Sequence, residues 1–261
     1  MGDFLLSIDG LVVSFPKKVG FFSNDRIPVL NGVSLGIKKG KTLGLVGESG
    51  SGKTTLGRSI VRLTPIDAGS VFFNGCCISE LEETEFLPYR RKIQMIFQDP
   101  FDSLNPKMTI EQILEEPLAI HFQQLSAFER RKRMLTLLDR VKLPRSYLRR
   151  YPNALSGGQR QRVGIARALA VEPEILICDE PVSALDVSIQ AAIMNLLKDL
   201  QAELELTYLF ISHDMAVVRY ISDTVAVMQS GRIVEYGPVE SVYRNPQEAY
   251  TKQLLAAIPQ L

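Results

Sequence analysis

The stretch GESGSGKT, residues 47–54, decides the fold of this sequence. It fits the P-loop pattern, with the apolar strand TLGLVG leading into it and the helical pattern TTLGRSIVRL leading out of it. Gly47, Gly50 and Gly52 let the backbone curl so that its amides point inward, and the following helix adds the positive end of its dipole. A plain glycine turn would need neither the lysine nor the threonine that end the motif.

Each residue of the loop therefore has an expected task. Lys53 is placed to reach the β and γ phosphates of a nucleoside triphosphate, and the Thr54 hydroxyl suits Mg²⁺. The predicted phosphate-binding residues are Gly47, Glu48, Ser49, Gly50, Ser51, Gly52, Lys53, Thr54 and Thr55.

An acidic pair closes the stretch ILICDE, residues 175–180. Four apolar residues predict a buried strand, and a Mg²⁺ ion bound to phosphates favours a further carboxylate held rigidly at a strand end. We assign Asp179 to Mg²⁺, directly or through water, and Glu180 to the attacking water as general base. The alternative is that the pair simply closes a strand at the surface.

A second helix with an exposed beginning is predicted by SGGQRQRVGIARAL, residues 156–169. Ser156, Gly157 and Gly158 leave the first amides of this helix unobstructed, as in an anion-binding helix start. Lys53 and its loop already enclose the phosphates from one side, so this second start could face the γ phosphate held by another subunit. The alternative is an ordinary capped core helix with solvated arginines.

The order of patterns along the chain predicts an α/β fold: a P-loop NTPase core with a mostly parallel sheet, an N-terminal antiparallel β subdomain and an inserted helical subdomain. The strands EILICDE and TYLFISHD are separated by a helical stretch over 187–204, and Lys39-Gly40-Lys41 is interpreted as a hairpin turn. All 261 residues are predicted to form a single domain with four parts. The antiparallel part comprises residues 1–40 and 65–80, and the P-loop core comprises 41–64, 81–99 and 165–240. The helical subdomain comprises 100–164, and 241–261 form a C-terminal helix.

Composition excludes several classes of protein. Lys and Arg total 30 against 29 Asp and Glu, so the overall charge gives no argument for nucleic acid or an anionic membrane as partner. No stretch approaches eighteen apolar residues and the first residues lack the build of a secretory signal, which predicts a cytosolic chain. The three cysteines offer no disulfide framework.

The motif LSGGQRQR, placed after a P-loop and before ILICDEP, resembles the signature of ATP-binding-cassette (ABC) ATPases, and the resemblance covers essentially the whole sequence. Such proteins pair head to tail, with two ATP molecules between one subunit's P-loop and the other's signature. The resemblance implies that Ser156, Gly157, Gly158 and Gln159 contact ATP across that interface.

The resemblance also implies roles for single residues. Gln98, after IQMIF, matches the glutamine that links Mg²⁺ and the attacking water to the helical subdomain. The stretch SALD, which ends at Asp186, matches the loop that crosses the dimer interface, with Asp186 as its polar anchor. His213 matches the histidine that contacts the γ phosphate. Phe15 is the candidate for stacking on adenine, with Phe21 and Phe22 as alternatives.

Longer stretches, among them IFQDPFDSLNPKMTI and YRNPQEAYTKQLLAAIP, are similar to the ATPase subunits of dipeptide, oligopeptide and nickel importers. This similarity implies ATP hydrolysis coupled to uptake of a peptide-like solute, at the cytoplasmic face of the cell membrane. The implied partners are two transmembrane permease subunits, an identical or different second ATPase subunit and an extracytoplasmic solute-binding protein. Many members continue past LLAAIP, sometimes with a cysteine cluster, and we expect no iron–sulfur site in this sequence.

Other functions stay open. Nickel or glutathione could replace peptide as the solute, and a soluble cassette acting on DNA or ribosomes is the alternative from another class, although no coiled-coil insertion or second cassette is present. A non-catalytic regulatory cassette is disfavoured because no catalytic position is degenerate. Residues 130–150 carry nine Lys or Arg against one acid, which could indicate nucleic acid. Because no aromatic residue other than Tyr147 is interleaved there, we favour a solvated face and expect no nucleic-acid partner.

Overall fold

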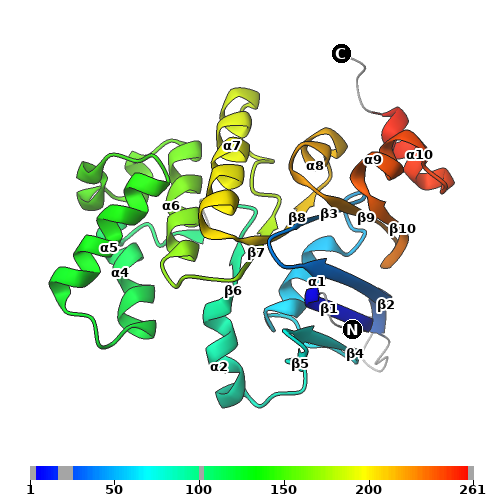
Figure 1. Ribbon diagram of the computed structural model, residues 1–261, viewed down its shortest axis with the longest axis horizontal. Coiled ribbons are helices and arrows are strands. Elements are labelled where there is room, and N and C mark those ends of the chain that lie inside the picture. Colours follow the sequence, from blue (N-terminus) through cyan, green and yellow to red (C-terminus); the bar gives the residue numbers. More distant parts are fainter. Residues whose placement is uncertain (1–3, 17–25, 100–102, 258–261) are drawn as a thin grey trace. The chain divides into compact units, whose positions relative to one another are not determined.

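The computed structural model describes residues 4–16, 26–99 and 103–257. It separates into two compact units: unit 1 comprises Met1–Tyr89 and Thr207–Leu261, and unit 2 comprises Arg90–Leu206. Figure 1 labels the elements of both units. Within the described ranges, no helix combines the length and the apolar character that crossing a membrane requires.

Unit 1 contains an antiparallel sheet in the order β2-β1-β4-β5. Its strands are β1 (Phe4–Pro16), β2 (Arg26–Lys38), β4 (Ala68–Phe73) and β5 (Cys76–Cys77). Buried and more accessible residues alternate along much of β1 and β2, as expected of a sheet with one face packed on a core. The predicted N-terminal antiparallel part is therefore present.

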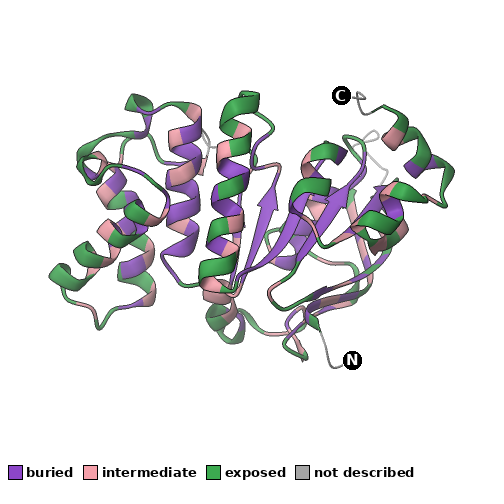
Figure 2. Cartoon of the chain, turned by 45° about the horizontal axis from the view of Figure 1, so that its top comes forward, coloured by how far each residue is buried: buried purple, intermediate pink, exposed green. Residues whose placement is uncertain are grey.

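The same unit contains a parallel group of strands around β3 (Thr42–Val46). This strand pairs in parallel with β8 (Thr207–Ser212) and with β9 (Thr224–Gln229), and β10 (Arg232–Pro238) pairs antiparallel with β9. All residues of β3 and β8 are buried, and the strands appear as a purple band in Figure 2. Burial on both faces explains why these strands are continuous apolar runs.

Two turns of unit 1 differ in kind, and the hairpin turn predicted at Lys39-Gly40-Lys41 is wrong. The Ser230-Gly231 turn joins β9 to β10, with left-handed φ values of 47° and 77° that suit a tight hairpin. Lys39-Gly40-Lys41 is a turn but not a hairpin turn, because β2 pairs with β1 whereas β3 pairs with β8 and β9. A turn signal does not reveal that the chain passes from one sheet to another.

The helices of unit 1 are α1 (Lys53–Ile60), α8 (Met215–Ile221), α9 (Val239–Arg244) and α10 (Ala249–Ala256). Helix α2 (Glu83–Lys92) begins in unit 1 and ends in unit 2. Helix α10 lies within the segment 241–261 that was predicted as a C-terminal helix, and the separate helix α9 precedes it and begins before that segment.

Unit 2 combines two parallel strands with a group of helices. β6 (Ile93–Ile96) pairs in parallel with β7 (Ile175–Asp179), so that Ile96 lies opposite Cys178. The helices are α4 (Ile110–His121), α5 (Ala127–Arg140), the 3₁₀ turns η1 (Arg145–Arg149) and η2 (Pro152–Ala154), α6 (Gly157–Leu169) and α7 (Val187–Leu204). Capping boxes begin three of them, at Thr109, Ser126 and Ser156, and the predicted helix over 187–204 is α7.

The compact units divide the chain at other positions than the predicted subdivision. Unit 2 includes β6, β7 and α7 together with the helices expected over 100–164, because β6 pairs with β7 and α6 packs on both β6 and α7. The finer boundaries given above stay a prediction.

Candidate functional site

The P-loop of unit 1 connects β3 to α1. Gly50 and Gly52 have φ values of 81° and 107°, and Gly52 is the N-cap of α1. Gly47 is required for a different reason: a Cβ atom there would lie 2.1 Å from the Met228 carbonyl oxygen on β9. The three glycines therefore provide the predicted curvature, two by their left-handed backbone and one by close approach.

Lys53 occupies the centre of this loop with only 5% of its surface exposed. Its Nζ donates to the carbonyl oxygens of Gly47 at 2.7 Å and Glu48 at 2.8 Å, and to Ser51 Oγ at 3.4 Å. The first turn of α1 contains no acidic residue, so the positive end of its dipole is not compensated by a carboxylate there. A buried ammonium group that donates to carbonyl oxygens at a helix start is suited to bind phosphate, whose charged oxygens are stronger acceptors.

Contacts from distant parts of the sequence hold the loop. Gly231, in the β9–β10 turn, donates its backbone amide to the Ser51 carbonyl at 2.9 Å. The backbone amide of Asn31 on β2 donates to the Gly231 carbonyl at the same distance. The Glu48 amide donates to the Tyr250 hydroxyl on α10 at 2.9 Å. Sequence reasoning missed these supports, because neither an isolated Asn in a strand nor an isolated Tyr in a helix carries a recognisable signal.

His213 lies at the same edge of the parallel strands as the P-loop. In the β3–β8 register Val46 lies opposite Ser212, so Gly47 and His213 each directly follow a paired residue. His213 is exposed, and the next residue, Asp214, caps α8 by accepting from two amides of its first turn. Two predicted phosphate-contacting groups of unit 1 are therefore brought to one sheet edge.

Phe15, the candidate for stacking on adenine, lies on β1 opposite Ile27. Its surface is 42% exposed, which leaves part of the ring accessible to a planar ligand. The alternatives Phe21 and Phe22 lie outside the described residues.

The acidic pair of unit 2 has the expected strand-end position. Asp179 ends β7 and is 1% exposed. Glu180 follows it with a left-handed φ of 45°, and its Oε2 accepts from Gln98 Nε2 at 3.0 Å. Burial, and then the charge of Asp179, raise the pKa of the neighbouring Cys178 thiol, which therefore packs as an apolar residue.

The β6–β7 register explains why Gln98 and Glu180 meet. Ile96 pairs with Cys178, so each of the two residues lies two positions beyond this pair. The structure thus joins two residues that the sequence predicted for one reaction step. A non-glycine residue with positive φ is strained, and such strain is common where a side chain must be aimed.

The signature segment begins α6 in unit 2. Ser156 is the N-cap and forms a capping box with Gln159: Ser156 Oγ accepts from the Gln159 amide and Gln159 Oε1 accepts from the Ser156 amide. Cβ atoms at Gly157 and Gly158 would lie 3.2 Å from Leu185 Cδ2 and 2.4 Å from Ile189 Cγ2. The glycines therefore also make room for the loop and helix start that follow β7.

Asp186, predicted for the dimer interface, is the N-cap residue of α7 and is exposed, and its side chain makes no capping hydrogen bond. Val187, which follows it, is 81% exposed. Both residues are therefore accessible at the surface of unit 2.

The arginines of α6 donate to backbone carbonyls and are buried or only partly exposed, which corrects the alternative of a helix with solvated arginines. Arg160 Nε donates to the Pro152 carbonyl at 2.7 Å, Arg162 Nη1 donates to the Val141 carbonyl at 2.8 Å, and Arg167 donates to the Ser103 carbonyl. Burial lowers the pKa of Arg162 and Arg167. These guanidinium groups bind carbonyls at chain turns of unit 2 and so fix the signature helix within that unit.

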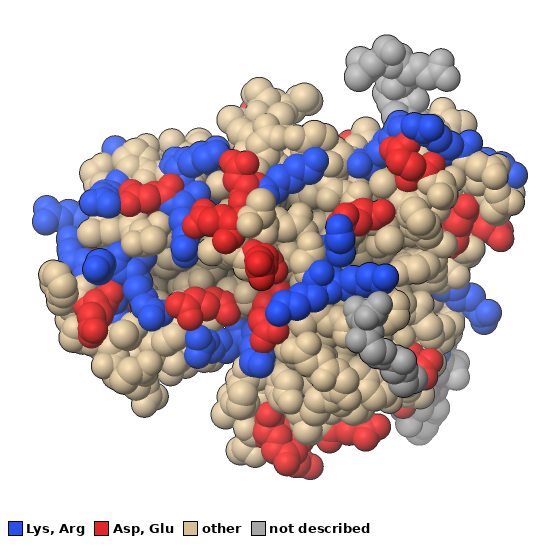
Figure 3. Space-filling model, viewed as in Figure 1, with Lys and Arg blue, Asp and Glu red and all other residues tan. Residues whose placement is uncertain are grey.

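The basic stretch 130–150 is largely paired with carboxylates. Figure 3 shows Lys and Arg side chains (blue) interspersed with Asp and Glu (red) over unit 2. The ion pairs are Arg130–Glu115, Arg131–Glu111, Arg133–Glu172, Arg140–Glu203, Lys142–Asp199 and Arg145–Asp139. This pattern is typical of a solvated ion-pair surface.

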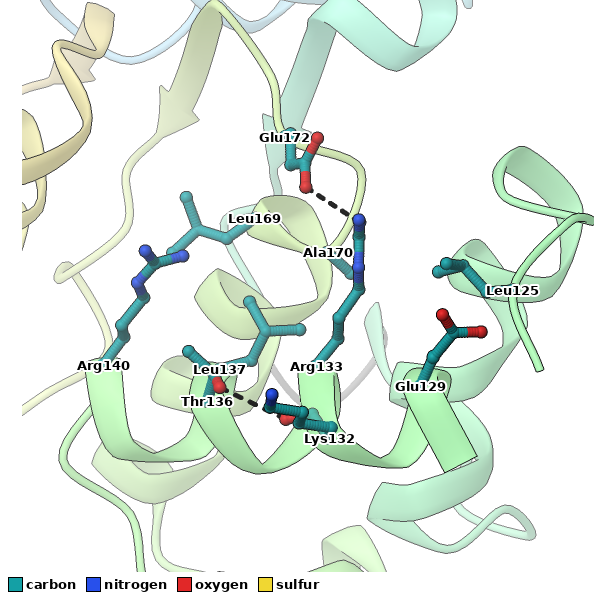
Figure 4. Close-up of a pocket in the computed structure, with 10 residues that line it drawn as sticks. All are labelled: Leu125, Glu129, Lys132, Arg133, Thr136, Leu137, Arg140, Leu169, Ala170 and Glu172. Carbon is teal, nitrogen blue, oxygen red and sulfur yellow. Dashed lines mark hydrogen bonds and ion pairs between the residues drawn. The ribbon is translucent and has the colours of Figure 1, made fainter. Parts of the chain in front are cut away.

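A hollow of about 330 Å³ lies between α5 and the end of α6 (Figure 4). Arg133 projects across it to Glu172, and Lys132 and Glu129 lie along the α5 side. No predicted nucleotide-binding residue lines this hollow, and its charges are of both signs.

The match to known families accounts for these features together. The model of a family described as ABC transporter matches residues 30–183, more than half of the chain. The chain belongs to the ABC transporter family. It is 53% identical to the oligopeptide transport ATP-binding protein OppF of Bacillus subtilis over 234 residues, which are 89% of this chain and 77% of that protein. It is 51% identical to a putative peptide import ATP-binding protein of Brucella ovis over 255 residues, 98% of this chain and 78% of the relative.

Solved structures of the family confirm the predicted fold class. A dimeric ATP-binding cassette in a post-hydrolysis state with ADP and phosphate superposes with a TM-score of 0.79 at 33% identity, covering 90% of this chain and 98% of that one. The protein CbiO1 of Clostridium perfringens, described as part of an ABC transporter complex, gives a TM-score of 0.79 at 28% identity, covering 93% of this chain and 92% of that one. The sequence-based assignment to ABC ATPases is thereby confirmed as well.

Proposed function

We propose that the chain is the ATP-hydrolysing subunit of a membrane ABC importer for peptide-like solutes. The observation that carries this proposal is the P-loop, in which Lys53 rests on the carbonyls of Gly47 and Glu48 beside His213 at one sheet edge. The import of peptides is supported by the names of the relatives in Bacillus subtilis and Brucella ovis.

ATP binding follows from the conformation of the loop. The β and γ phosphates replace the carbonyl oxygens around Lys53 Nζ, since an ion pair with a charged oxygen is stronger than a bond to a neutral one. The amides of residues 50–55 and the start of α1 surround the remaining phosphate oxygens. His213 then contacts the γ phosphate, and the exposed ring of Phe15 stacks on adenine.

The donor set fits Mg²⁺. Within the described residues, no cluster of three or more His, Cys, Asp or Glu side chains suits a metal ion, so an ion must be bound by mixed oxygen donors together with phosphate. The Thr54 hydroxyl, the Gln98 amide oxygen and the Asp179 carboxylate are hard oxygen ligands of the kind that Mg²⁺ prefers. When bound, the ion neutralises charge that develops on the phosphates.

Glu180 takes the proton of the attacking water. Its Oε2 accepts from Gln98 Nε2, which restrains the rotation of the side chain. The left-handed backbone at Glu180 aims the carboxylate at the cost of local strain. The Gln98 side-chain amide can serve both groups because it has a donor and an acceptor. Its NH₂ group holds the Glu180 carboxylate that activates the water, and its oxygen is the proposed ligand of Mg²⁺.

Two ATPase subunits share each ATP in this proposal. Ser156, Gly157, Gly158 and Gln159 present the first turn of α6 to ATP bound by the other subunit, and Asp186 lies in the same interface. The capping box orders this helix start in advance, and the exposed Val187 beside Asp186 becomes covered on pairing. The solved dimer of a related cassette supports this arrangement.

The remaining parts of the system follow from the relatives. Two transmembrane permease subunits, a second ATPase subunit, identical or different, and an extracytoplasmic solute-binding protein complete the importer. The chain is then a peripheral protein of the cytoplasmic membrane face, and closing of the ATPase pair drives the permeases between two states.

Glu180→Gln tests the proposed chemistry, because the amide preserves the size and the contact with Gln98 but cannot accept a proton. General base catalysis contributes about 10²–10⁴-fold, so the hydrolysis rate is expected to fall by that factor while the Kd for ATP changes little. Asp199→Asn, a surface carboxylate paired with Lys142 on unit 2, serves as the matched control. Hydrolysis by Glu180→Gln at the parent rate would refute the assignment of the base.

A further inference from the structure

The hydroxyl of Tyr250 reaches the P-loop from the C-terminal helix α10. It accepts the Glu48 amide hydrogen at 2.9 Å, joining residues 202 positions apart. The side chain is only 8% exposed, and burial raises the pKa of its hydroxyl, which is therefore neutral at physiological pH. The P-loop motif itself does not require this contact, since a glycine-rich loop leading into a helix is complete without it.

The contact fixes the peptide on which the phosphate-binding lysine rests. While the amide of Glu48 is held by Tyr250, its carbonyl oxygen accepts from Lys53 Nζ at 2.8 Å and from the Ser51 amide at 3.2 Å. The Gly47 carbonyl, at the other end of the peptide unit that contains the Glu48 amide, accepts from the same Nζ at 2.7 Å. Both ends of the Gly47–Glu48 peptide unit are thus bound, so that a change at the hydroxyl is transmitted to the resting position of Lys53.

Helix α10 is in turn attached to the strand pair that supports the loop. Glu235 on β10 accepts from the amides of Gln247 at 2.9 Å and Glu248 at 3.2 Å, directly before α10 begins. The same strand follows the turn in which Gly231 donates to the Ser51 carbonyl. The hydroxyl of Tyr250 is therefore presented from a fixed position, two residues after an anchored helix start.

We propose that Tyr250 is a positioning residue for ATP, whose hydroxyl orders the P-loop before the nucleotide arrives. The inference rests on the proposed ATPase function. A loop that is already ordered loses less conformational entropy on binding than one that ATP must order itself. Tyr250 acts through Glu48 and does not touch the phosphates, so α10 becomes part of the nucleotide site without carrying any of its motifs.

Tyr250→Phe removes the hydroxyl and keeps the ring. Tyr243→Phe is the matched control, because the Tyr243 hydroxyl on α9 donates to the Met215 carbonyl, which is not part of the P-loop. The Kd for MgATP is measured by calorimetry on the full chain, and amide hydrogen exchange at Glu48 is followed without nucleotide. We expect about three- to tenfold weaker ATP binding for Tyr250→Phe, corresponding to the loss of one hydrogen bond, and faster exchange at Glu48 by a similar factor.

Tyr243→Phe is expected to bind ATP and exchange the Glu48 amide like the parent. If the parent itself fails to bind ATP, the proposed function falls, and this inference falls with it. If the parent binds ATP but Tyr250→Phe matches Tyr243→Phe in both measurements, only the role of Tyr250 is overturned. A lowered Tm of Tyr250→Phe with unchanged Kd and exchange would likewise show that the hydroxyl serves packing alone.

Discussion

Gly47→Ala tests whether the P-loop has the close-packed geometry described above. The added Cβ would lie 2.1 Å from the Met228 carbonyl oxygen and 2.9 Å from Ser51 Oγ. Met228 belongs to β9, which pairs with β3 on one side and β10 on the other, so its backbone cannot easily move away. The distance between the added Cβ and the Met228 carbonyl oxygen must increase by about 1 Å to reach van der Waals contact, so the backbone of the P-loop has to move by most of that distance.

Overpacking of this kind costs about 1–3 kcal/mol. For a domain of this size each kcal/mol corresponds to about 2–4 °C, so the Tm of Gly47→Ala is expected to fall by about 2–12 °C. ATP binding should weaken as well, because the Gly47 carbonyl is one of the resting acceptors of Lys53 Nζ.

The assay is thermal unfolding followed by circular dichroism without nucleotide, together with the Kd for ATP. Gly164→Ala in α6 is the control, because a Cβ there meets nothing within 4 Å, and it should stabilise the chain by about 0.5–1 kcal/mol. The reasoning would be refuted if Gly47→Ala unfolded at the parent temperature and bound ATP as the parent does.

Three further predictions concern unit 2. Arg160→Met removes a buried guanidinium that donates to the Pro152 carbonyl, and a loss of about 1.5–3 kcal/mol is expected in urea unfolding; an unchanged midpoint would show that the bond contributes nothing. Ser156→Ala breaks the capping box and should lower the unfolding free energy by about 1 kcal/mol in the same assay. A decrease of less than about 0.3 kcal/mol would contradict this prediction. Burial, and then the charge of Arg91, lower the pKa of His121 below its ordinary 6.5, so the unfolded chain takes up this proton first and stability falls as pH drops through about 6.5. His121→Gln should flatten this part of the curve of Tm against pH, and an unaltered slope would assign it to other groups.

The parts of the molecule that depend on local sequence were predictable. A P-loop requires glycines, a lysine and a threonine at fixed spacing, and apolar residues recur with helical periodicity over 187–204. Both elements were therefore predicted from residues near one another in the chain. Gln98 and Glu180 were predicted separately, and parallel pairing of β6 with β7 brings them together because each lies two residues beyond the Ile96–Cys178 pair.

Features created by distant contacts were not predictable. The turn at 39–41 resembles a hairpin turn locally, but the chain crosses there from one sheet to another because β3 finds its partners around 165 and 180 residues later. The arginines of α6 resemble a solvated face, yet their acceptors are carbonyls of turns that only the folded unit supplies. Tyr250 is one aromatic residue in a short helix, and nothing in its neighbourhood indicates that Glu48 is its partner.

The sharing of ATP between two chains is tested most directly by sedimentation of the full chain carrying Glu180→Gln, with and without saturating MgATP. ATP is expected to double the mass of this variant, whereas adding Ser156→Arg should leave the Kd for ATP unchanged and abolish the doubling. A chain that stays monomeric when its P-loop is saturated, or that doubles its mass equally with Arg at position 156, would contradict the account.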